Sequence, residues 1–245
     1  MIVERSAAAA APSSELDRRV RVHAALADRH RLRIVDELAL SDRSPGELAS
    51  RLAIGTNLLA HHVGVLEAAG LVARLPSDGD GRRRYLHLTA PDVPVHPDTT
   101  TAERVVFVCM HNTARSQLAA AIWRATSEVP AESAGTHPAD EVHPSAIAAA
   151  ARAGLDLSGA TPRPLDDVGP GPALMVTVCD MAHERLLDLG APAALHWSIP
   201  DPARARSDQA FDAVVEALSA RVDALRARVV RARVRPPTTR RRHRP

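Results

Sequence analysis

Residues 105–117 read VVFVCMHNTARSQ, and this stretch decides the fold of the second half of the chain. The uninterrupted apolar run Val105–Val108 is typical of a buried parallel strand. It leads directly into a loop that begins at Cys109, and the residues after the loop have helical character from Gln117 to Ala125. A loop between a buried strand and a helix directs backbone N–H groups and the helix dipole at one point, so this loop is suited to bind an anion.

The same loop carries residues that can perform chemistry. A field of amide dipoles favours the thiolate of Cys109, which makes it the expected nucleophile. Arg115 can hold two oxygens of a tetrahedral oxyanion. Ser116 can donate to the thiolate, and Asn112 can brace the loop. The whole loop is the predicted oxyanion site: Met110, His111, Asn112, Thr113, Ala114, Arg115 and Ser116. The structural alternative is that Cys109 only fills a buried strand end.

Further strand and helix signals alternate after this loop, as in an α/β domain with a parallel sheet. We predict strands at Ala131–Gly135, Leu174–Val178 and Ala194–Ile199, a helix at Pro144–Ala153, and a long amphipathic helix from Asp208 toward Arg228.

The first ninety residues have a different pattern, of helices followed by a hairpin. Helical spacing runs from Leu16 to Ala27, where Asp28 ends it, and again from His30 to Leu38. Ser44 and Pro45 are typical of a helix start, and Gly70 of a helix end. We therefore predict a winged helix-turn-helix with helices at Pro45–Leu52 and from Thr56 or Asn57 to Ala69, and strands at Leu71–Leu75 and Arg84–Leu88.

A proline- and threonine-rich stretch at 90–103 divides the two patterns. The sequence thus predicts an α/β multi-domain protein: a winged-helix domain at 14–90, a linker at 91–103, a parallel-sheet domain at 104–228 and a basic disordered tail at 229–245.

The charge is unevenly distributed. All 31 basic residues are arginine, and the net charge is +2. Residues 226–245 contain nine of these arginines and no acid, so the basic isoelectric point comes from the tail. Such a tail can bind nucleic acid by releasing counterions, or it can be a solvated low-complexity segment. The absence of a long apolar run and of an export signal predicts a cytoplasmic protein with no membrane partner.

Residues 15–89 resemble the DNA-binding domain of the ArsR family of bacterial repressors. The stretches that carry the resemblance are AHHVGVLEAAGLV at 60–72 and GRRRYLHLT at 81–89. The resemblance implies binding to a double-stranded DNA operator, with Thr56, Asn57, Ala60 and His61 in the major groove and Arg82 and Arg83 on phosphate or in the minor groove. His62 shares a helical face with apolar residues and is expected to pack in the core.

Two departures limit this resemblance. Arsenic-sensing relatives carry a cysteine pair where this chain has residues 37–42, which hold no thiol. We see no other cluster of histidines and carboxylates at ligand spacing before residue 95, so no metal site is expected there. No dimer-forming helix follows the predicted wing, so a homodimer would have to form through residues 15–27. Two operator half-sites require such a dimer.

Residues 104–225 resemble the low molecular weight protein tyrosine phosphatases and the arsenate reductases related to them. Cys109, Asn112, Arg115 and Ser116 fall on the loop positions of that family, and the pair Asp201-Pro202 falls on its general acid motif. Asp201 would then protonate the oxygen that leaves phosphorus or arsenic. A purely structural capping role for Asp201 is the alternative.

Three features favour arsenate reduction over ester hydrolysis. Residues 115–119, with the pair His111-Asn112, look more like those of the reductases, and Ala203 stands where phosphatases usually carry an aromatic residue. Cys179 lies 70 residues after Cys109, where thioredoxin-coupled reductases carry their second cysteine. Reduction takes two electrons and hence two thiols. The third cysteine of those relatives is absent, so either Cys109 and Cys179 form the only disulfide or a small cytosolic thiol attacks the arsenylated Cys109. Cys179 could instead simply fill the core.

The sequence therefore predicts a DNA-binding regulator fused to an arsenate reductase with Cys109, Arg115, Asp201 and Cys179 as catalytic residues. No cofactor is expected to be bound. The electrons would come from an external thiol reductant: mycothiol, glutaredoxin or thioredoxin. Two alternatives remain open, namely a regulator whose second domain senses an oxyanion or redox state without turnover, and a tyrosine phosphatase that binds phosphate esters.

Overall fold

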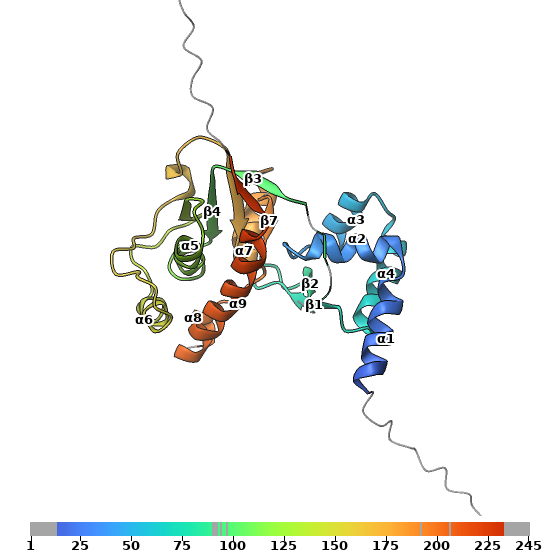
Figure 1. Ribbon diagram of the computed structural model, residues 1–245. Helices are drawn as coiled ribbons and strands as arrows, with labels where there is room; N and C mark the ends of the chain where they lie inside the picture. Colours follow the sequence, from blue (N-terminus) through green and yellow to red (C-terminus); the bar gives the residue numbers. More distant parts are fainter. Residues whose placement is uncertain are drawn as a thin grey trace, which may run out of the picture.

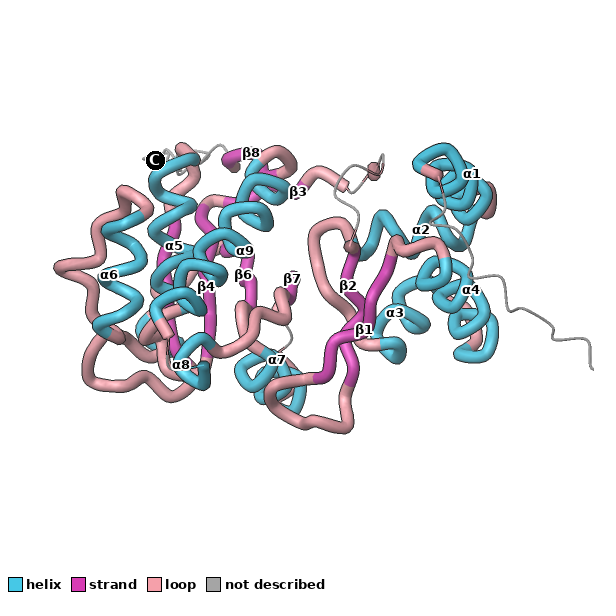
Figure 2. The backbone as a smooth tube through the Cα atoms, turned by 90° about the horizontal axis from the view of Figure 1, so that it is seen from below, coloured by secondary structure: helices cyan, strands magenta, loops and turns pink. Residues whose placement is uncertain are grey.

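The computed structural model of the chain describes residues 14–89, 93, 95–96, 98–191, 193–205 and 207–232. A helical region with a hairpin lies beside a parallel-sheet region (Figure 1). The hairpin lies between the helices of the first region and the sheet of the second (Figure 2). The expected mixed α/β, two-region fold is confirmed. None of the described helices is long and apolar enough to span a bilayer.

The first region contains α1 Glu15–Leu26, α2 Arg29–Leu38, α3 Pro45–Leu52, α4 Thr56–Ala68, β1 Val72–Pro76 and β2 Arg84–Leu88. Its helix starts follow from local chemistry: Ser14 and Ser44 both form capping boxes, with Asp17 and Glu47 respectively. The helices pack through apolar residues that are almost fully buried, among them Ile34, Leu48, Leu59 and Leu66.

Two helix boundaries in this region differ from expectation. Gly55 is the N-cap of α4, so Thr56 is its first residue rather than its cap. Asp28 does more than end α1: its carboxylate accepts hydrogen bonds from the backbone of His30 and Arg31 and so caps α2. Ala53 ends α3 in a left-handed conformation with φ of 53°.

The second region is built on four parallel strands in the order β5-β4-β6-β7. They are β4 Arg104–Cys109, β5 Ala131–Gly135, β6 Ala173–Thr177 and β7 Leu195–His196. The helices are α5 Arg115–Thr126, α6 Pro144–Arg152, α7 Asp180–Asp188, α8 Pro202–Ala205 and α9 Asp208–Arg226, with a short 3-10 turn at Leu165–Asp167. The central strand β4 is flanked on both sides and its apolar side chains are buried, as its composition predicts.

The strand expected at Ala194–Ile199 is much shorter than predicted. Only Leu195–His196 pairs with β6, and the chain then turns to the first region. The Trp197 indole donates to the carbonyl of Leu40, and the backbone N–H of Ser198 donates to Asp42. The backbone N–H of Trp197 still donates to Thr177 of β6, whereas that of Ser198, which a longer strand would have used in the sheet, is bonded to the first region.

The predicted linker and the predicted tail both include residues that form strands in the structure. Thr100–Ala102 forms β3 and pairs in parallel with β8, Val229–Arg231. The end of the expected linker and the start of the expected tail are thus ordered against each other. The remainder of the arginine-rich tail, from residue 233 on, lies outside the described residues.

A buried polar interface joins the two regions. Asp42 is fully buried, and its carboxylate accepts hydrogen bonds from Arg221 of α9 at 2.6 Å and from the backbone of Ser198 at 2.7 Å. The His183 and His196 rings stack with centroids 4.0 Å apart, and His183 lies 3.2 Å from Glu47. Buried charges are costly unless they are paired, so this interface strongly favours one relative placement of the two regions.

Candidate functional site

The loop after β4 is organised around the sulfur of Cys109. Its Sγ accepts a hydrogen bond from the backbone N–H of Asn112 at 3.2 Å and lies 3.0 Å from the Ser116 hydroxyl. Only 3% of Cys109 is exposed. The predicted nucleophile therefore stands at the strand end with a backbone donor and a hydroxyl directed at it.

Asn112 holds this loop in shape. Its amide nitrogen donates to the Ser116 hydroxyl at 2.7 Å, and its amide oxygen accepts from Gln117 at 3.2 Å and from the backbone of Arg163 at 3.0 Å. Its backbone is left-handed, with φ of 55°, a conformation that asparagine tolerates better than most residues. The bracing role expected for Asn112 thus has specific partners.

Close packing fixes the other side of the loop. A side chain at Gly135, at the end of β5, would place its Cβ 2.9 Å from the carbonyl of Met110. The carbonyls of Met110, His111 and Thr113 accept hydrogen bonds from backbone groups in the segment 137–143. Among the loop residues His111 is exposed, while Ala114 is buried at the helix start. The peptide planes of the loop are therefore set by bonded neighbours.

Arg115 begins α5 and lies across the site toward Asp201. Its guanidinium donates to the carbonyl of Ile199 at 2.9 Å and lies 3.4 Å from the Asp201 carboxylate. Burial alone would lower the pKa of Arg115, but the neighbouring Cys179, Cys109 and Asp201 outweigh it and raise that pKa. The expected cation and the expected acid are thus adjacent, and the cation keeps its charge.

Cys179 follows β6 at the same sheet edge at which Cys109 follows β4. The two strands are parallel neighbours, and Val178 donates its backbone N–H to the carbonyl of Val108 at 2.8 Å. Cys179 is fully buried and caps α7 by accepting from Ala182 at 3.4 Å. Burial, together with the charge of Cys109, raises the pKa of Cys179 to about 12. Both thiols are free.

The wing loop, defined here as residues 77–80 between β1 and β2, reaches this site from the first region. The Asp78 carboxylate accepts the backbone N–H of Asp201 at 2.9 Å, and the backbone N–H of Asp78 donates to Asp180 at 2.7 Å. Arg204 also contacts Asp78. The general acid candidate is therefore positioned partly by the wing loop, which no local sequence signal indicated.

A second group of wing contacts converges on Glu184 of α7. Its carboxylate accepts from the hydroxyls of Ser77 at 2.7 Å and Tyr85 at 3.2 Å, and from the backbone of Asp80 at 2.9 Å. A Cβ at Gly79 would lie 2.5 Å from a Glu184 oxygen, so this close approach requires glycine. The helix that Cys179 caps is thus bonded along its length to the wing loop.

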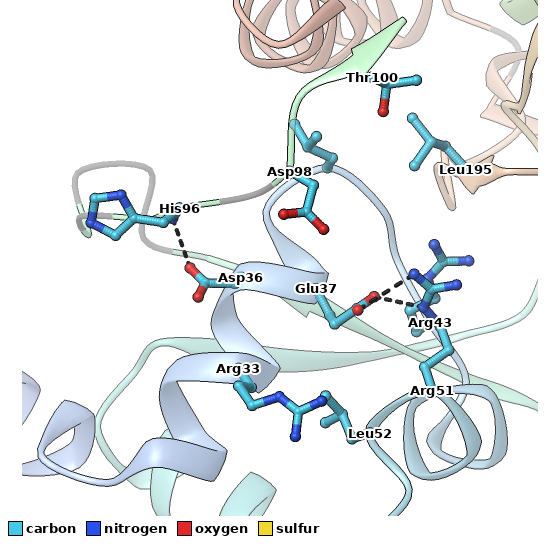
Figure 3. A pocket seen from close by; sticks show the side chains of 11 residues that line it. Arg33, Asp36, Glu37, Arg43, Arg51, Leu52, His96, Asp98, Thr100 and Leu195 are labelled. Carbon is cyan, nitrogen blue, oxygen red and sulfur yellow. Dashed lines mark hydrogen bonds and ion pairs between the residues drawn. The ribbon is translucent and has the colours of Figure 1, made fainter.

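Two cavities of about 350 Å³ lie near these contacts. One is lined by the wing loop and α7 and reaches the catalytic loop at Met110. The other lies between α2, α3 and β7 and is lined by arginines and acids, with Arg51 already paired to Glu37 (Figure 3). Neither Cys109 nor Cys179 lines either of these two cavities, and the first reaches the catalytic loop only at Met110.

The residues expected to contact DNA fall into two groups. Thr56, Asn57, Ala60 and His61 are all exposed on α4. Arg82 is largely exposed beside Asp80. Arg83 is 38% exposed and lies about 4 Å from both Asp80 and Asp188 of α7. The helix face is therefore free, whereas one wing arginine faces the second region.

One cluster of potential ligands in the first region was not apparent from the sequence. Asp28, His30 and His62 come together although their sequence spacing gave no ligand pattern. Helix packing brings α4 against the start of α2, which sequence spacing alone does not reveal. His62 is buried, as expected, but neither of its ring nitrogens has a hydrogen-bond partner.

Comparison with known proteins finds a match in each of the two regions. Residues 104–235 match the sequence model of the family described as low molecular weight phosphotyrosine protein phosphatase. Residues 26–74 match a model described as a helix-turn-helix domain. Similar solved structures align over about half of this chain, and they include both reductases and phosphatases.

Three of these structures are as follows. Arsenate reductase from Archaeoglobus fulgidus is 30% identical, with 51% of this chain and 99% of that chain covered and a TM-score of 0.42. The low molecular weight protein tyrosine phosphatase from T. tengcongensis is 24% identical, with 51% and 97% covered and a TM-score of 0.45. The tyrosine phosphatase Wzb from Escherichia coli K30 is 24% identical, with 50% and 94% covered and a TM-score of 0.45.

Proposed function

This chain belongs to the low molecular weight phosphotyrosine protein phosphatase family and carries a helix-turn-helix domain before it, and from this premise we propose that it is a DNA-binding regulator with arsenate reductase activity. The observation that carries the proposal is a second buried thiol, Cys179, at the same sheet edge as Cys109 and electrostatically coupled to it. Ester hydrolysis requires one thiol, whereas reduction requires two.

The first step is nucleophilic attack on arsenic. The Cys109 thiolate forms an S–As bond with arsenate, and one oxygen leaves as water after Asp201 gives it a proton. Arg115 and the loop amides hold the remaining oxygens, because they present positive charge and donors where the negative charge gathers. The 3.4 Å separation of Arg115 and Asp201 puts the oxygen-binding cation and the acid side by side.

The second step transfers two electrons to arsenic. The sulfur of Cys179 attacks the sulfur of Cys109, an S–S bond forms, and the S–As bond breaks with its electron pair going to arsenic as arsenite. Burial and the negative charge of Cys109 raise the pKa of Cys179. Formation of the S–As bond removes that negative charge, so Cys179 loses its proton more readily once the first step is complete. An external thiol, such as mycothiol or the thiols of glutaredoxin or thioredoxin, then reduces the disulfide.

The experiment that tests this proposal measures arsenate-dependent oxidation of added thiol by the full chain. We expect turnover with the parent protein, none with Cys109→Ser and none with Cys179→Ala. An aryl phosphate serves as a second substrate, since its hydrolysis needs only Cys109. Arsenate turnover that survives Cys179→Ala contradicts the two-thiol step, and aryl phosphate turnover without arsenate reduction supports the phosphatase alternative.

A second candidate function is regulation of the DNA-binding region by the state of the catalytic site. The observation that favours it is the bonding of the wing loop to Asp180 and Glu184 of the helix that Cys179 caps, and to the backbone of Asp201. A disulfide between Cys109 and Cys179 withdraws the cap of α7 and thereby disturbs the wing contacts. A change at the sulfur would then alter how the wing is presented to DNA.

Retention of the DNA that precedes the chain's own coding sequence tests this candidate. We expect retention to differ between reduced protein, oxidised protein and protein with bound arsenate or phosphate. Retention that is indifferent to all three treatments contradicts the regulatory candidate and leaves the reductase proposal standing.

Operator binding also requires two copies of the first region. The α1 residues Leu16 and Val20 are 65% and 58% exposed and lie one helical turn apart. This supports a homodimer formed through α1, as the missing helix after the wing suggested. Sedimentation of the Leu16→Glu variant is expected to give a monomer, and an unchanged dimer contradicts this arrangement.

A further inference from the structure

Three potential metal ligands meet between the start of α2 and the middle of α4. One ligand atom from each of Asp28, His30 and His62 lies within 4.8 Å of the others. The Asp28 carboxylate is 3.7 Å from Nδ1 of His62 and 4.0 Å from Nδ1 of His30. The two histidines are stacked, with ring centroids 5.1 Å apart.

The ring nitrogens of His62 have no hydrogen-bond partner among the described residues. The residue is buried, with 5% of it exposed. Buried polar side chains nearly always have a partner, because losing water without replacement costs free energy. Nδ1 of His62 lies 3.7 Å from the Asp28 carboxylate and its ring stacks on His30, so a ligand bound among these three side chains would give it a partner.

The surroundings of two of these side chains suit a bound cation. Burial lowers the pKa of His62, so its site disfavours the protonated ring. Backbone hydrogen bonds from Arg31 and His30 lower the pKa of Asp28, which keeps its carboxylate ionised. The guanidinium of Arg31 donates to backbone carbonyls of α1, so its own hydrogen bonds do not compete for the carboxylate.

We propose that Asp28, His30 and His62 form a binding site for a divalent transition-metal ion of the zinc class. Two imidazole nitrogens and one carboxylate oxygen are the donors that such ions take, and three protein ligands leave a fourth position for water. Tetrahedral coordination places ligand atoms about 3.3 Å apart, so metal binding requires the three side chains, whose ligand atoms lie within 4.8 Å of one another, to move closer together. The ion joins α2 to α4, the helix whose exposed residues are expected to contact DNA.

The test uses the full chain with both cysteines replaced, Cys109→Ser and Cys179→Ser, because thiolates also bind zinc. After chelator treatment, the protein is titrated with Co²⁺ followed by absorption spectroscopy, and with Zn²⁺ followed by calorimetry. We expect one ion per chain and the visible absorption of a low-coordinate cobalt site. Asp28→Asn keeps a side chain that caps α2 equally well, yet it removes the charged ligand.

Asp28→Asn and His30→Ala are each expected to weaken metal binding by at least about 10-fold. His62→Gln is expected to do the same. His23→Ala, an exposed histidine of α1, is the matched control and keeps the affinity of the parent. Thermal melting followed by circular dichroism verifies that Asp28→Asn and His30→Ala remain folded. Binding that is equal in the parent and in these two variants, or an absence of stoichiometric binding, overturns the proposal.

Discussion

The catalytic loop that begins at Cys109 and the wing loop at 77–80 each follow a strand, and each contains a residue that contacts Asp201. The two loops are held in place differently. The sulfur of Cys109 is bonded to Asn112 and Ser116, all within seven residues. The wing loop finds its partners, Asp180, Glu184 and Asp201, more than one hundred residues away. The bonds to the Cys109 sulfur are local and the other bonds of the catalytic loop stay within the second region, whereas the wing loop is held by contacts between the two regions.

This difference assigns separate tasks to the two loops. The catalytic loop is held by residues of its own region, including 137–143 and Arg163, and fixed geometry of this kind suits chemistry. A loop with distant bonds depends on how the two regions are docked, which suits a contact that can be released. The following variants test this contrast from the strongest expected effect to the weakest.

The largest effect is expected at the nucleophile. Cys109→Ser replaces the reacting sulfur with a weaker nucleophile of similar size and is expected to lower arsenate reduction by about 10³-fold or more. The melting temperature should remain close to that of the parent, since the hydroxyl can keep the Asn112 and Ser116 contacts. The measurement is thiol oxidation in the presence of arsenate, and a variant with parent activity contradicts the role of Cys109.

Asn112 tests how strongly the local network specifies the catalytic loop. Asn112→Ala leaves the backbone N–H of Arg163 without an acceptor and removes one of the two acceptors of the Gln117 amide, which costs roughly 1–3 kcal/mol. It also places alanine at a positive φ, at about 1 kcal/mol more. Asn112→Gly tolerates that φ and isolates the hydrogen-bond part. Urea unfolding should rank the parent above the glycine variant and that variant above the alanine variant. Equal unfolding free energies in the parent and both variants would contradict the bracing role of Asn112.

Glu184 tests the distant network of the wing loop. Glu184→Ala leaves Ser77, Tyr85 and Asp80 without their acceptor, so unfolding free energy is expected to fall by roughly 1–3 kcal/mol. Proteolysis between β1 and β2 should become faster, because the wing loop loses its contact with α7. The control is Glu216→Ala, on the exposed side of α9. If both variants are cleaved at the same rate, the wing is not held by Glu184.

The smallest effect is expected in the pH dependence of the stability that Glu47 contributes through its contact with His183. Burial alone would raise the pKa of Glu47, but hydrogen bonds from His183 and Ser44 outweigh it and lower that pKa from 4.5 to about 2. A lowered pKa in the folded protein means that the carboxylate stabilises the fold above pH 4.5 and that this contribution is lost as the pH falls from 4.5 toward 2. Urea midpoints should fall less steeply over this window in Glu47→Gln than in the parent. Parallel pH profiles would contradict this assignment.

The sequence predicted most of what depends on local pattern. The bounds of α3, Pro45–Leu52, follow from Ser44, Pro45 and a left-handed end at Ala53. The buried strand β4 and the loop after it could likewise be predicted, because the strand, the anion-binding loop and the helix follow one another directly in the sequence. The sheet-edge position of Cys179 followed from its place after a second buried strand.

The sequence could not predict what depends on how the two regions dock. Beyond β7 the backbone N–H of Ser198 donates to Asp42 of the first region rather than to the sheet, and no residue near Ser198 in the sequence indicates that partner. The same holds for Asp78 at the general acid and for His62 beside Asp28, where the helices bring distant residues together. Pairing of β3 with β8 joins residues far apart in the chain and was missed for the same reason.

The central claim is that two sulfurs of this chain supply the electrons that reduce arsenic. The most direct measurement incubates the reduced full chain with arsenate, without external thiol, then quenches it with an alkylating agent and maps the cysteines by mass spectrometry. The account predicts a disulfide between Cys109 and Cys179 that forms only when arsenate is present and is absent in Cys109→Ser. Recovery of both cysteines singly alkylated after exposure to arsenate would contradict it.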